Sequence, residues 1–521
     1  MNIKTWSGTV LVLLLALAWP AAGRLFAQGR QAPPPEYKEL VAAHDIQDAA
    51  VRLKEFERIK AAYPDSRFTE AIEGSILEAK VELAETLKDI LALQKDFMAK
   101  GRGPARLQNP VILAVQLLNH PRLGTFDASE VLDAVLKFRE EAFKIAEDPA
   151  VYEELPQDQR GFFKSQVINA FELLGAKAYL NAGDAAKAMG ALESYKKAGG
   201  PTGGNYQYVL AAVLERTGKI EGAYDAYLTA AVENYEDAAD RAKALYVKIH
   251  GQADGFEAAL EAKFKALPFR PEPFKAPADW KGKAVLAELF TGSECPPCVG
   301  ADLAFDGLVE AVPAKYLAVL VYHLPIPRPD PMMNPATQVR QKAYNVNSTP
   351  TVVIDGTNKS LGGGGRGAAE GKFAQYRAAI EPLLAAAPAV LLKARASLAG
   401  DTVNVSYDFD KAVPGADYLL VLVQDEQEHK GSNGIVYHKM VVRDLLVADS
   451  AAPRSAVFDL AASEKAADAY LTEFEKTYTR VPDFKWEVRR NTLPRKGLKV
   501  IFFVQEKGTG KVLNAVVADV K

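Results

Sequence analysis

Cysteine is nearly missing from this chain. Only two of its 521 residues are cysteines, and both belong to one C-x-x-C pair, Cys295 and Cys298. Any thiol chemistry is therefore confined to that pair. A single pair without a second one is a poor match to the spacing of zinc ligands. A disulfide that closes a four-residue loop also constrains little of the unfolded chain, so stability is a weak reason for it.

The chain also lacks an excess of positive charge. Its 63 basic and 66 acidic residues give a formal net charge of −3, so we expect no nucleic-acid partner, which would need a basic face. The glycines at 362–365 are far from a G-x-x-x-x-G-K-[ST] pattern, which favours a turn over a phosphate cradle. Length and the 49% hydrophobic content are those of an ordinary soluble protein with about three or four domains.

Long apolar runs are absent beyond the first residues. Residues 1–27 contain Lys4, an apolar run from Val10 to Trp19, and then Pro20 with small residues, which is the pattern of a secretory signal peptide. The run is too short for a convincing transmembrane span, although an uncleaved anchor is the alternative. We therefore expect cleavage and a periplasmic or secreted mature protein. The proline-rich residues 28–36 are interpreted as a linker.

Residues 37–267 predict an all-α region, because long segments rich in Ala, Leu, Glu and Lys are separated by Gly and Pro turns. We divide it into a helical region, 37–160, and a repeat region, 161–267. A pattern of small, large, turn-glycine, small and large residues recurs there after 35 positions. Its members are Ala176, Tyr179, Gly183, Ala188 and Leu192, followed by Ala211, Leu214, Gly218, Ala223 and Tyr227.

This repeat resembles the tetratricopeptide repeat, which has a period of about 34 residues. Small residues let paired helices approach each other, and the glycine closes the turn between them. The resemblance implies a concave surface that holds a peptide or a protein partner. A scaffold or dimerisation arm is the alternative.

After a proline-rich linker, residues 268–280, the chain reads WKGKAVLAELFTGSECPPC from Trp280 to Cys298. We expect a buried strand at 284–290, a turn, and a helix from Pro296 onward. The two cysteines would then share the first turn of the helix and face the same way, close enough for a disulfide. A helix N-terminus lowers a cysteine pKa, so Cys295 is the expected attacking sulfur.

A second motif, NVNSTPTVVID from Asn345 to Asp355, places Thr-Pro before a β-branched run. Together the two motifs resemble the thioredoxin-like fold, in particular its secreted thiol:disulfide interchange branch, over residues 281–386. The resemblance implies protein clients with thiols or disulfides, a redox partner that recycles the thiols, and no cofactor.

The resemblance also implies a role for each of five residues. Cys295 attacks a client, and Cys298 resolves the mixed disulfide. Pro350 is cis and, with Thr349, shapes the groove for an extended substrate strand and keeps metals from the sulfurs. Glu288 lies one residue away from the position at which such proteins bury an acid that moves protons for the resolving cysteine. A surface or ion-pair role is the alternative for Glu288.

Residues 387–521 change to a period of two, with segments such as TVNVSYDF and KVIFFVQEK, which predicts an all-β sandwich. His429 and His438 are the only histidines there, and no cysteine or acidic pair completes a metal site. We expect surface or packing roles for them, and a binding or docking role for the domain.

Three functions are therefore considered. The first is a secreted or periplasmic thiol:disulfide oxidoreductase with an all-α repeat region, a central α/β domain and a β-sandwich. The second is a non-enzymatic interaction protein in which the C-x-x-C disulfide is structural. The third is a copper-handling protein that uses soft ligands. The ligands considered for copper are Cys295, Cys298, His323 and Met332 or Met333.

Overall fold

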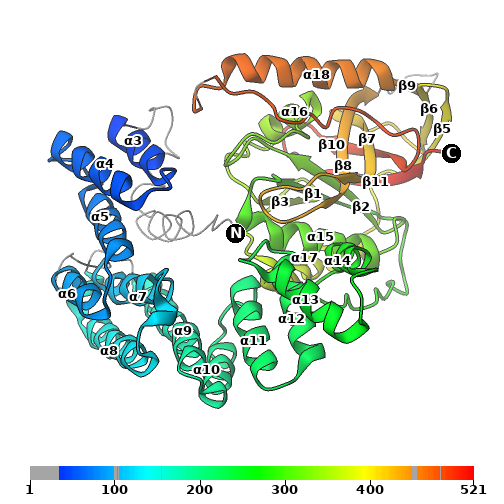
Figure 1. Cartoon of the computed structure of the whole chain (residues 1–521). Coiled ribbons are helices and arrows are strands. Elements are labelled where there is room, and N and C mark those ends of the chain that lie inside the picture. Colours follow the sequence, from blue (N-terminus) through cyan, green and yellow to red (C-terminus); the bar gives the residue numbers. More distant parts are fainter. Residues whose placement is uncertain are drawn as a thin grey trace. The chain divides into compact units, whose positions relative to one another are not determined.

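The computed structural model describes residues 34–98, 103, 105–153, 155, 157–448, 454–481 and 483–521 (Figure 1). The predicted signal peptide, 1–27, and most of the linker, 28–36, lie outside these residues. Internal contacts divide the chain into two compact units. The first comprises the described residues up to 231 together with 235–252, and the second comprises 232–234 and the described part of 253–521. None of the described helices is long and apolar enough to cross a membrane.

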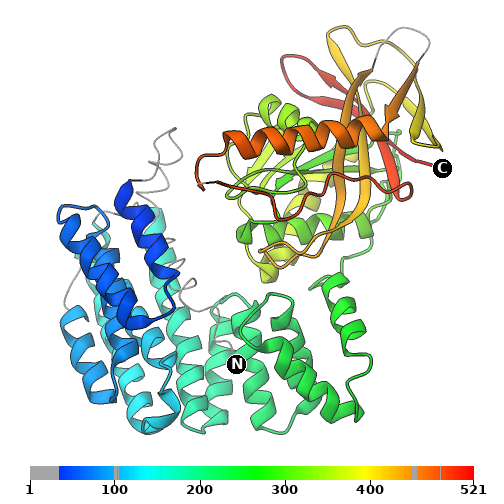
Figure 2. The ribbon, with the colours of Figure 1, turned by 45° about the horizontal axis from the view of Figure 1, so that its top comes forward.

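The first unit is helical, as predicted, and Figure 2 shows its helices side by side. Asp48, Asp127 and Asp184 begin three of them by accepting hydrogen bonds from first-turn backbone amides. The helices are α3 (Pro35–His44), α4 (Ala49–Ala62), α5 (Thr69–Leu83), α6 (Leu87–Met98), α7 (Ala105–Leu118), α8 (Ala128–Glu147), α9 (Gln157–Asn181), α10 (Ala185–Lys197), α11 (Gly204–Arg216), α12 (Ile220–Ala231) and α13 (Ala238–His250).

The repeated positions occupy equivalent places in successive helix pairs. Gly183 and Gly218 have φ angles of +82° and +76° in the turns after α9 and α11, where a side chain would be strained. The repeated alanines on either side of each turn are fully buried. They are Ala176, Ala188, Ala211 and Ala223. The sequence pattern therefore predicts both the turns and the close contacts between helices.

The second unit combines strands and helices. Its helices are α14 (Phe256–Lys265), α15 (Val299–Ala311), α16 (Pro335–Ala343), α17 (Ala369–Leu384) and α18 (Leu460–Thr477), with the 3-10 turn η3 (Pro296–Cys298). Its strands are β1 (Val285–Thr291), β2 (Leu317–His323), β3 (Thr351–Ile354), β4 (Asn358–Leu361), β5 (Leu392–Ala399), β6 (Thr402–Phe409), β7 (Ala416–Glu428), β8 (Tyr437–Ala448), β9 (Ser455–Asp459), β10 (Leu498–Glu506) and β11 (Val512–Asp519).

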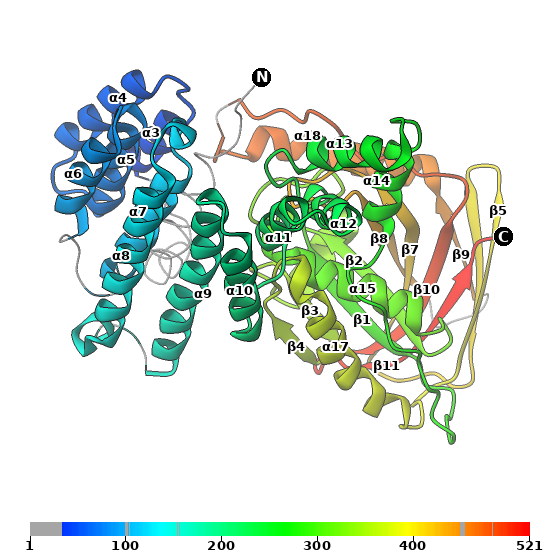
Figure 3. The same ribbon diagram turned by 60° about the horizontal axis from the view of Figure 1, so that its bottom comes forward.

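Eight of these strands form one sheet, in the order β11-β10-β7-β8-β2-β1-β3-β4. Strands β1 and β2 are parallel, and β3 runs antiparallel to β1. Strand β8 joins β2 in parallel through Val321 and Val441. Helices α15 and α17 lie on one side of the sheet (Figure 3), whereas α16 and α18 lie on the other (Figure 1).

The C-terminal region is rich in strands, as predicted, but it is not an all-β sandwich. Strands β7, β8, β10 and β11 continue the sheet that contains β1, and α18 is a helix. The physical reason lies in the apolar runs of β7 and β10, which are buried along most of their length. A strand buried on both faces needs a neighbour on each side and a layer above and below. One such layer is the small sheet β5-β6-β9, which packs against β7 and β10.

Candidate functional site

Cys295 and Cys298 form a disulfide at the head of α15, with their Cα atoms 5.3 Å apart. Strand β1 ends at Thr291, and the turn that follows places Cys295 directly before η3. The Cys298 amide donates to the Cys295 carbonyl at 3.0 Å, which closes the loop between the two cysteines. The sequence therefore predicts the local geometry well. However, neither cysteine has exposed surface, although Cys295 is the expected attacking sulfur.

The segment Thr349–Pro350 forms one wall of the site. The peptide bond between the two residues is cis, as the resemblance implies. The Thr349 hydroxyl lies 3.4 Å from the Cys295 sulfur and donates a hydrogen bond to the Ile326 carbonyl at 2.8 Å. Of the two predicted substrate-groove residues, Thr349 thus contacts the disulfide, and Pro350 follows it in the chain.

The glycine run forms a second wall. The Gly364 amide donates to the Pro297 carbonyl at 2.7 Å, and the Gly300 amide donates to the Gly364 carbonyl at 2.7 Å. A Cβ atom on Gly363 would lie 1.9 Å from the Pro297 oxygen and 2.7 Å from Cγ of Pro350. The glycine run is therefore more than the expected turn, because it also packs against the disulfide loop. This packing requires a residue without a side chain at position 363.

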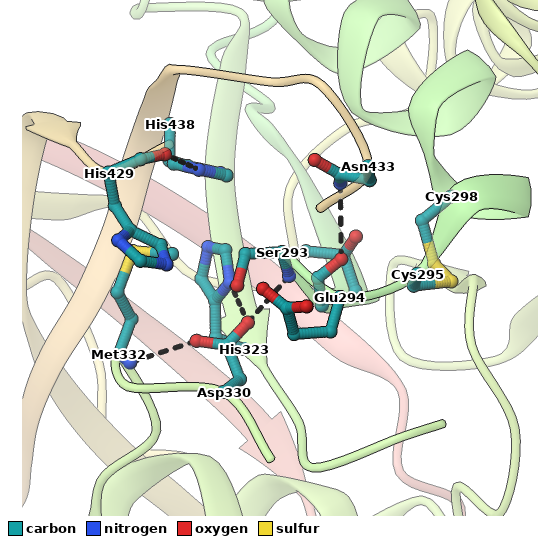
Figure 4. A network of polar contacts seen from close by, with 12 residues as sticks. Ser293, Glu294, Cys295, Cys298, His323, Asp330, Met332, His429, Asn433 and His438 are labelled. Atoms are coloured by element: carbon teal, nitrogen blue, oxygen red, sulfur yellow. Dashed lines mark hydrogen bonds and ion pairs between the residues drawn. A yellow bond between two sulfur atoms is a disulfide. The ribbon is translucent and has the colours of Figure 1, made fainter. Parts of the chain in front are cut away.

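A loop between β7 and β8, residues 429–436, covers the turn that precedes the disulfide (Figure 4). The Asn433 backbone amide donates to the Ser293 carbonyl at 3.1 Å, and the Asn433 side chain donates to the Gly292 carbonyl at 3.3 Å. The Ser432 amide donates to the Glu294 carboxylate at 3.3 Å. We call residues 429–436 the cover loop. Sequence reasoning missed it because no local pattern links it to the C-x-x-C.

Glu288 is fully buried, but its contacts give it the ion-pair role. Both of its carboxylate oxygens accept hydrogen bonds from Arg340, at 2.8 and 2.9 Å, and Tyr344 and Tyr322 donate at 2.5 and 3.1 Å. Successive residues of a strand face opposite sides of the sheet. Glu288 therefore faces α16, whereas Thr291, which hydrogen-bonds to α15, faces the side of the disulfide helix.

A buried Asp–His cluster lies behind the turn (Figure 4). Asp330 accepts hydrogen bonds from the amides of Ser293 and Met332 at 2.6 and 2.8 Å and from Nδ1 of His323 at 2.9 Å. Burial acts to raise the pKa of Asp330, but the charge and hydrogen bond of His323, together with the two amides, hold it well below its ordinary value. The turn before Cys295 is thus tied to an ionised carboxylate.

The two histidines that we expected at the surface or in packing roles are both buried and join this cluster. The ring centroids of His323 and His438 are 5.1 Å apart, and those of His429 and His438 are 6.2 Å apart. His438 Nε2 bonds to the His429 carbonyl at 2.9 Å. Burial lowers the pKa of His438 to about 3, and it also lowers that of His429. His438 has a packing role, as predicted.

Asp302 is a site residue that sequence reasoning missed. Asp302 lies in the first turn of α15, four positions after Cys298, which caps the helix. The two side chains therefore lie on one face of the helix. The Thr291 hydroxyl donates to its carboxyl at 3.0 Å. Burial raises the pKa of Asp302 to about 7. The signal available in the sequence was the four-residue spacing from the second cysteine.

Replacing Asp302 with asparagine is expected to stabilise the second unit by about 1–2 kcal/mol at pH 8 and to have little effect at pH 4. The pKa of Asp302 rises from 3.8 to about 7 on folding, so its contribution to stability is fully present below pH 4 and is lost as the pH rises through 7. Melting temperatures at pH 4, 6 and 8 measure this. Asp279→Asn, at an exposed position, is the control. A difference that is constant across pH would contradict the expectation.

Among the described residues, no three His, Cys, Asp or Glu side chains are arranged to hold a metal ion. Comparisons of the chain with protein-family models, with curated proteins and with solved structures found no match.

Proposed function

We propose that this chain is a secreted or periplasmic thiol:disulfide oxidoreductase that exchanges disulfides with protein clients. The observation that carries the proposal is the Cys295–Cys298 disulfide at the head of α15, in contact with the cis Thr349–Pro350 segment. A pair of cysteines at a helix start has access to a stabilised thiolate, which is the nucleophile in exchange.

The fold supports a thioredoxin-like assignment for residues 281–386. The elements follow the order β1, α15, β2, α16, β3, β4 and α17, and the strands lie in the order β2-β1-β3-β4. The helix pairs of the first unit support tetratricopeptide-like repeats over 161–267. We propose that the repeats bind a protein partner.

The proposed exchange is as follows. In the reducing direction, the Cys295 thiolate attacks a client disulfide, so that one client sulfur bonds to Cys295 and the other leaves as a thiolate. The Cys298 thiolate then attacks the Cys295 sulfur, which releases the client thiolate and forms the Cys295–Cys298 bond. Two electrons pass to the client, and a redox partner restores them. Asp302, one helical turn after Cys298, accepts the Cys298 proton.

Access to the sulfurs is a requirement of this proposal. Because neither cysteine is exposed, a client reaches Cys295 only when the cover loop or the Thr349 wall moves. The cover loop is held to residues 292–294 by three hydrogen bonds with donor–acceptor distances of 3.1 to 3.3 Å. These are few polar contacts to break, and a client strand that donates to the same carbonyls would replace two of them.

Replacing Cys298 with serine is expected to trap mixed disulfides between Cys295 and client proteins, because the resolving thiol is gone. The measurement is non-reducing electrophoresis and mass spectrometry of the variant expressed with its signal peptide. Cys295→Ser is the matched control and should trap far fewer adducts. Equal trapping by both variants would contradict the assigned roles.

The non-enzymatic alternative is favoured by one observation, the complete burial of both sulfurs. It is separated by equilibrating the folded protein with thiol buffers between about −270 and −180 mV and counting alkylated thiols by mass. Reversible exchange supports the oxidoreductase. A disulfide that reacts only after unfolding, together with no adducts in the Cys298→Ser variant, would support a structural bridge.

A further inference from the structure

His323 has one ring nitrogen that the Asp–His cluster leaves unused. Its Nδ1 bonds to Asp330 at 2.9 Å, and the side chains of both residues have no exposed surface. Nδ1 therefore faces the Asp330 carboxylate, and Nε2 is the nitrogen of this ring that is left to bind a metal. That Nε2 atom is buried and has no hydrogen-bond partner. Histidines that bind metals are commonly held in this way, by a carboxylate on the other nitrogen.

His429 provides a second nitrogen of the same kind. It is 8% exposed, and its Nε2 atom is also buried without a hydrogen-bond partner. The rings of His323 and His429 both lie beside the His438 ring, with centroids 5.1 and 6.2 Å from it, and Figure 4 shows them on the side of Ser293 away from the disulfide.

Met332 supplies a third ligand atom. It is 1% exposed, and its amide is fixed by the Asp330 carboxylate at 2.8 Å. Figure 4 shows its side chain pointing from the backbone beside Asp330 toward the His429 ring. A thioether offers a soft, polarizable sulfur.

We propose that Nε2 of His323, Nε2 of His429 and the Met332 thioether form a Cu(I) site. Soft thioether ligands select Cu(I), and imidazoles bind it well. Zn²⁺ is disfavoured, since the described residues bring together no three His, Cys, Asp or Glu side chains that could hold an ion. This set replaces the cysteines of the copper alternative with His429. It contains neither cysteine, and it therefore fits the oxidised protein.

The proposal is tested with the Cys295→Ser/Cys298→Ser double variant, in which no thiol remains to bind metal. The mature protein is titrated anaerobically with Cu(I) against a coloured Cu(I) chelator. We expect one equivalent to bind. Met332→Leu and His429→Asn should each weaken binding at least about 10-fold, and Asp330→Asn should weaken it about 10- to 100-fold by releasing His323.

Two variants serve as matched controls. Met333→Leu removes a thioether that is equally buried, and His250→Asn removes an exposed imidazole. Both should leave the affinity within about twofold, and circular dichroism establishes that every variant is folded. X-ray absorption of the copper complex should show a sulfur neighbour that Met332→Leu removes. No Cu(I) binding, unchanged binding in Met332→Leu, or tighter binding of Zn²⁺ than of Cu(I) would overturn the proposal. A buried water molecule would then account for the two nitrogens.

Discussion

Replacing Glu288 with alanine is expected to lower the free energy of unfolding of the second unit by about 3–5 kcal/mol. The variant leaves the Arg340 guanidinium buried, with its side chain only 3% exposed, and without a negative partner. Burial disfavours its charge, and Glu288 is the main group that raises the pKa of Arg340 above its ordinary value. Gln505 and Tyr344 remain as neutral contacts, which do not compensate a buried charge.

Urea denaturation followed by tryptophan fluorescence measures this loss selectively. The chain has four tryptophans, and those beyond the predicted signal peptide, Trp280 and Trp486, both belong to the second unit. Glu272→Ala is a suitable control, because that carboxylate is 88% exposed and lies 3.9 Å from Arg377. It should cost less than about 0.5 kcal/mol.

A second comparison separates the ion-pair role of Glu288 from the general-base role. The double variant Glu288→Leu/Arg340→Met should recover most of the lost stability, since an apolar pair of similar volume can replace a buried ion pair. Its disulfide should still exchange at a rate near that of the wild type. A stable double variant with strongly slowed exchange would instead assign Glu288 to proton transfer.

Replacing Gly363 with alanine is expected to destabilise the second unit by about 2–3 kcal/mol. It should also make the thiols of Cys295 and Cys298 more accessible, so that alkylating reagents modify the reduced protein faster. The new Cβ would meet the Pro297 oxygen at 1.9 Å, so the backbone on one side must move. The clash also reaches the ring of Pro350 at 2.7 Å, which would push apart two walls of the site.

Gly365→Ala is the matched control for this prediction. A Cβ at Gly365 has no atom within 4 Å, and its φ of −70° suits any residue. It should leave both the stability and the rate of alkylation close to those of the wild type. Equal effects of the two variants would show that the glycine run acts through chain flexibility and that the contact with Pro297 is unimportant.

Local patterns predicted the parts of the site that are close in sequence. The C-x-x-C at a helix start predicted the disulfide. The Thr-Pro motif predicted that Thr349–Pro350 forms a wall beside Cys295. The repeated glycines and alanines predicted the helix pairs of the first unit, in which the glycines form the turns and the alanines are buried. In each case the determining contacts lie within one turn, one strand or one helix pair, so spacing and residue type suffice.

The remaining parts depend on pairings between distant strands. The cover loop reaches the disulfide only because β8 joins β2, and no residue pattern in either strand specifies its partner. The predicted role of Glu288 depends on its position along the strand to within one residue. Moving by one residue along a strand changes the face of the sheet on which a side chain lies, and position 288 places the carboxylate on the face that carries α16.

The shared sheet has a consequence for anyone who divides this protein into pieces. The sequence suggests that a fragment could end at residue 386, just after α17. Such a fragment would leave β2 as a bare edge strand of seven buried residues, because β8 is its neighbour on that side. Unpaired apolar edges promote aggregation. The smallest piece that keeps the surroundings of the Cys295–Cys298 disulfide intact therefore extends to β11, and a study of reactivity on the shorter fragment would examine an uncovered disulfide.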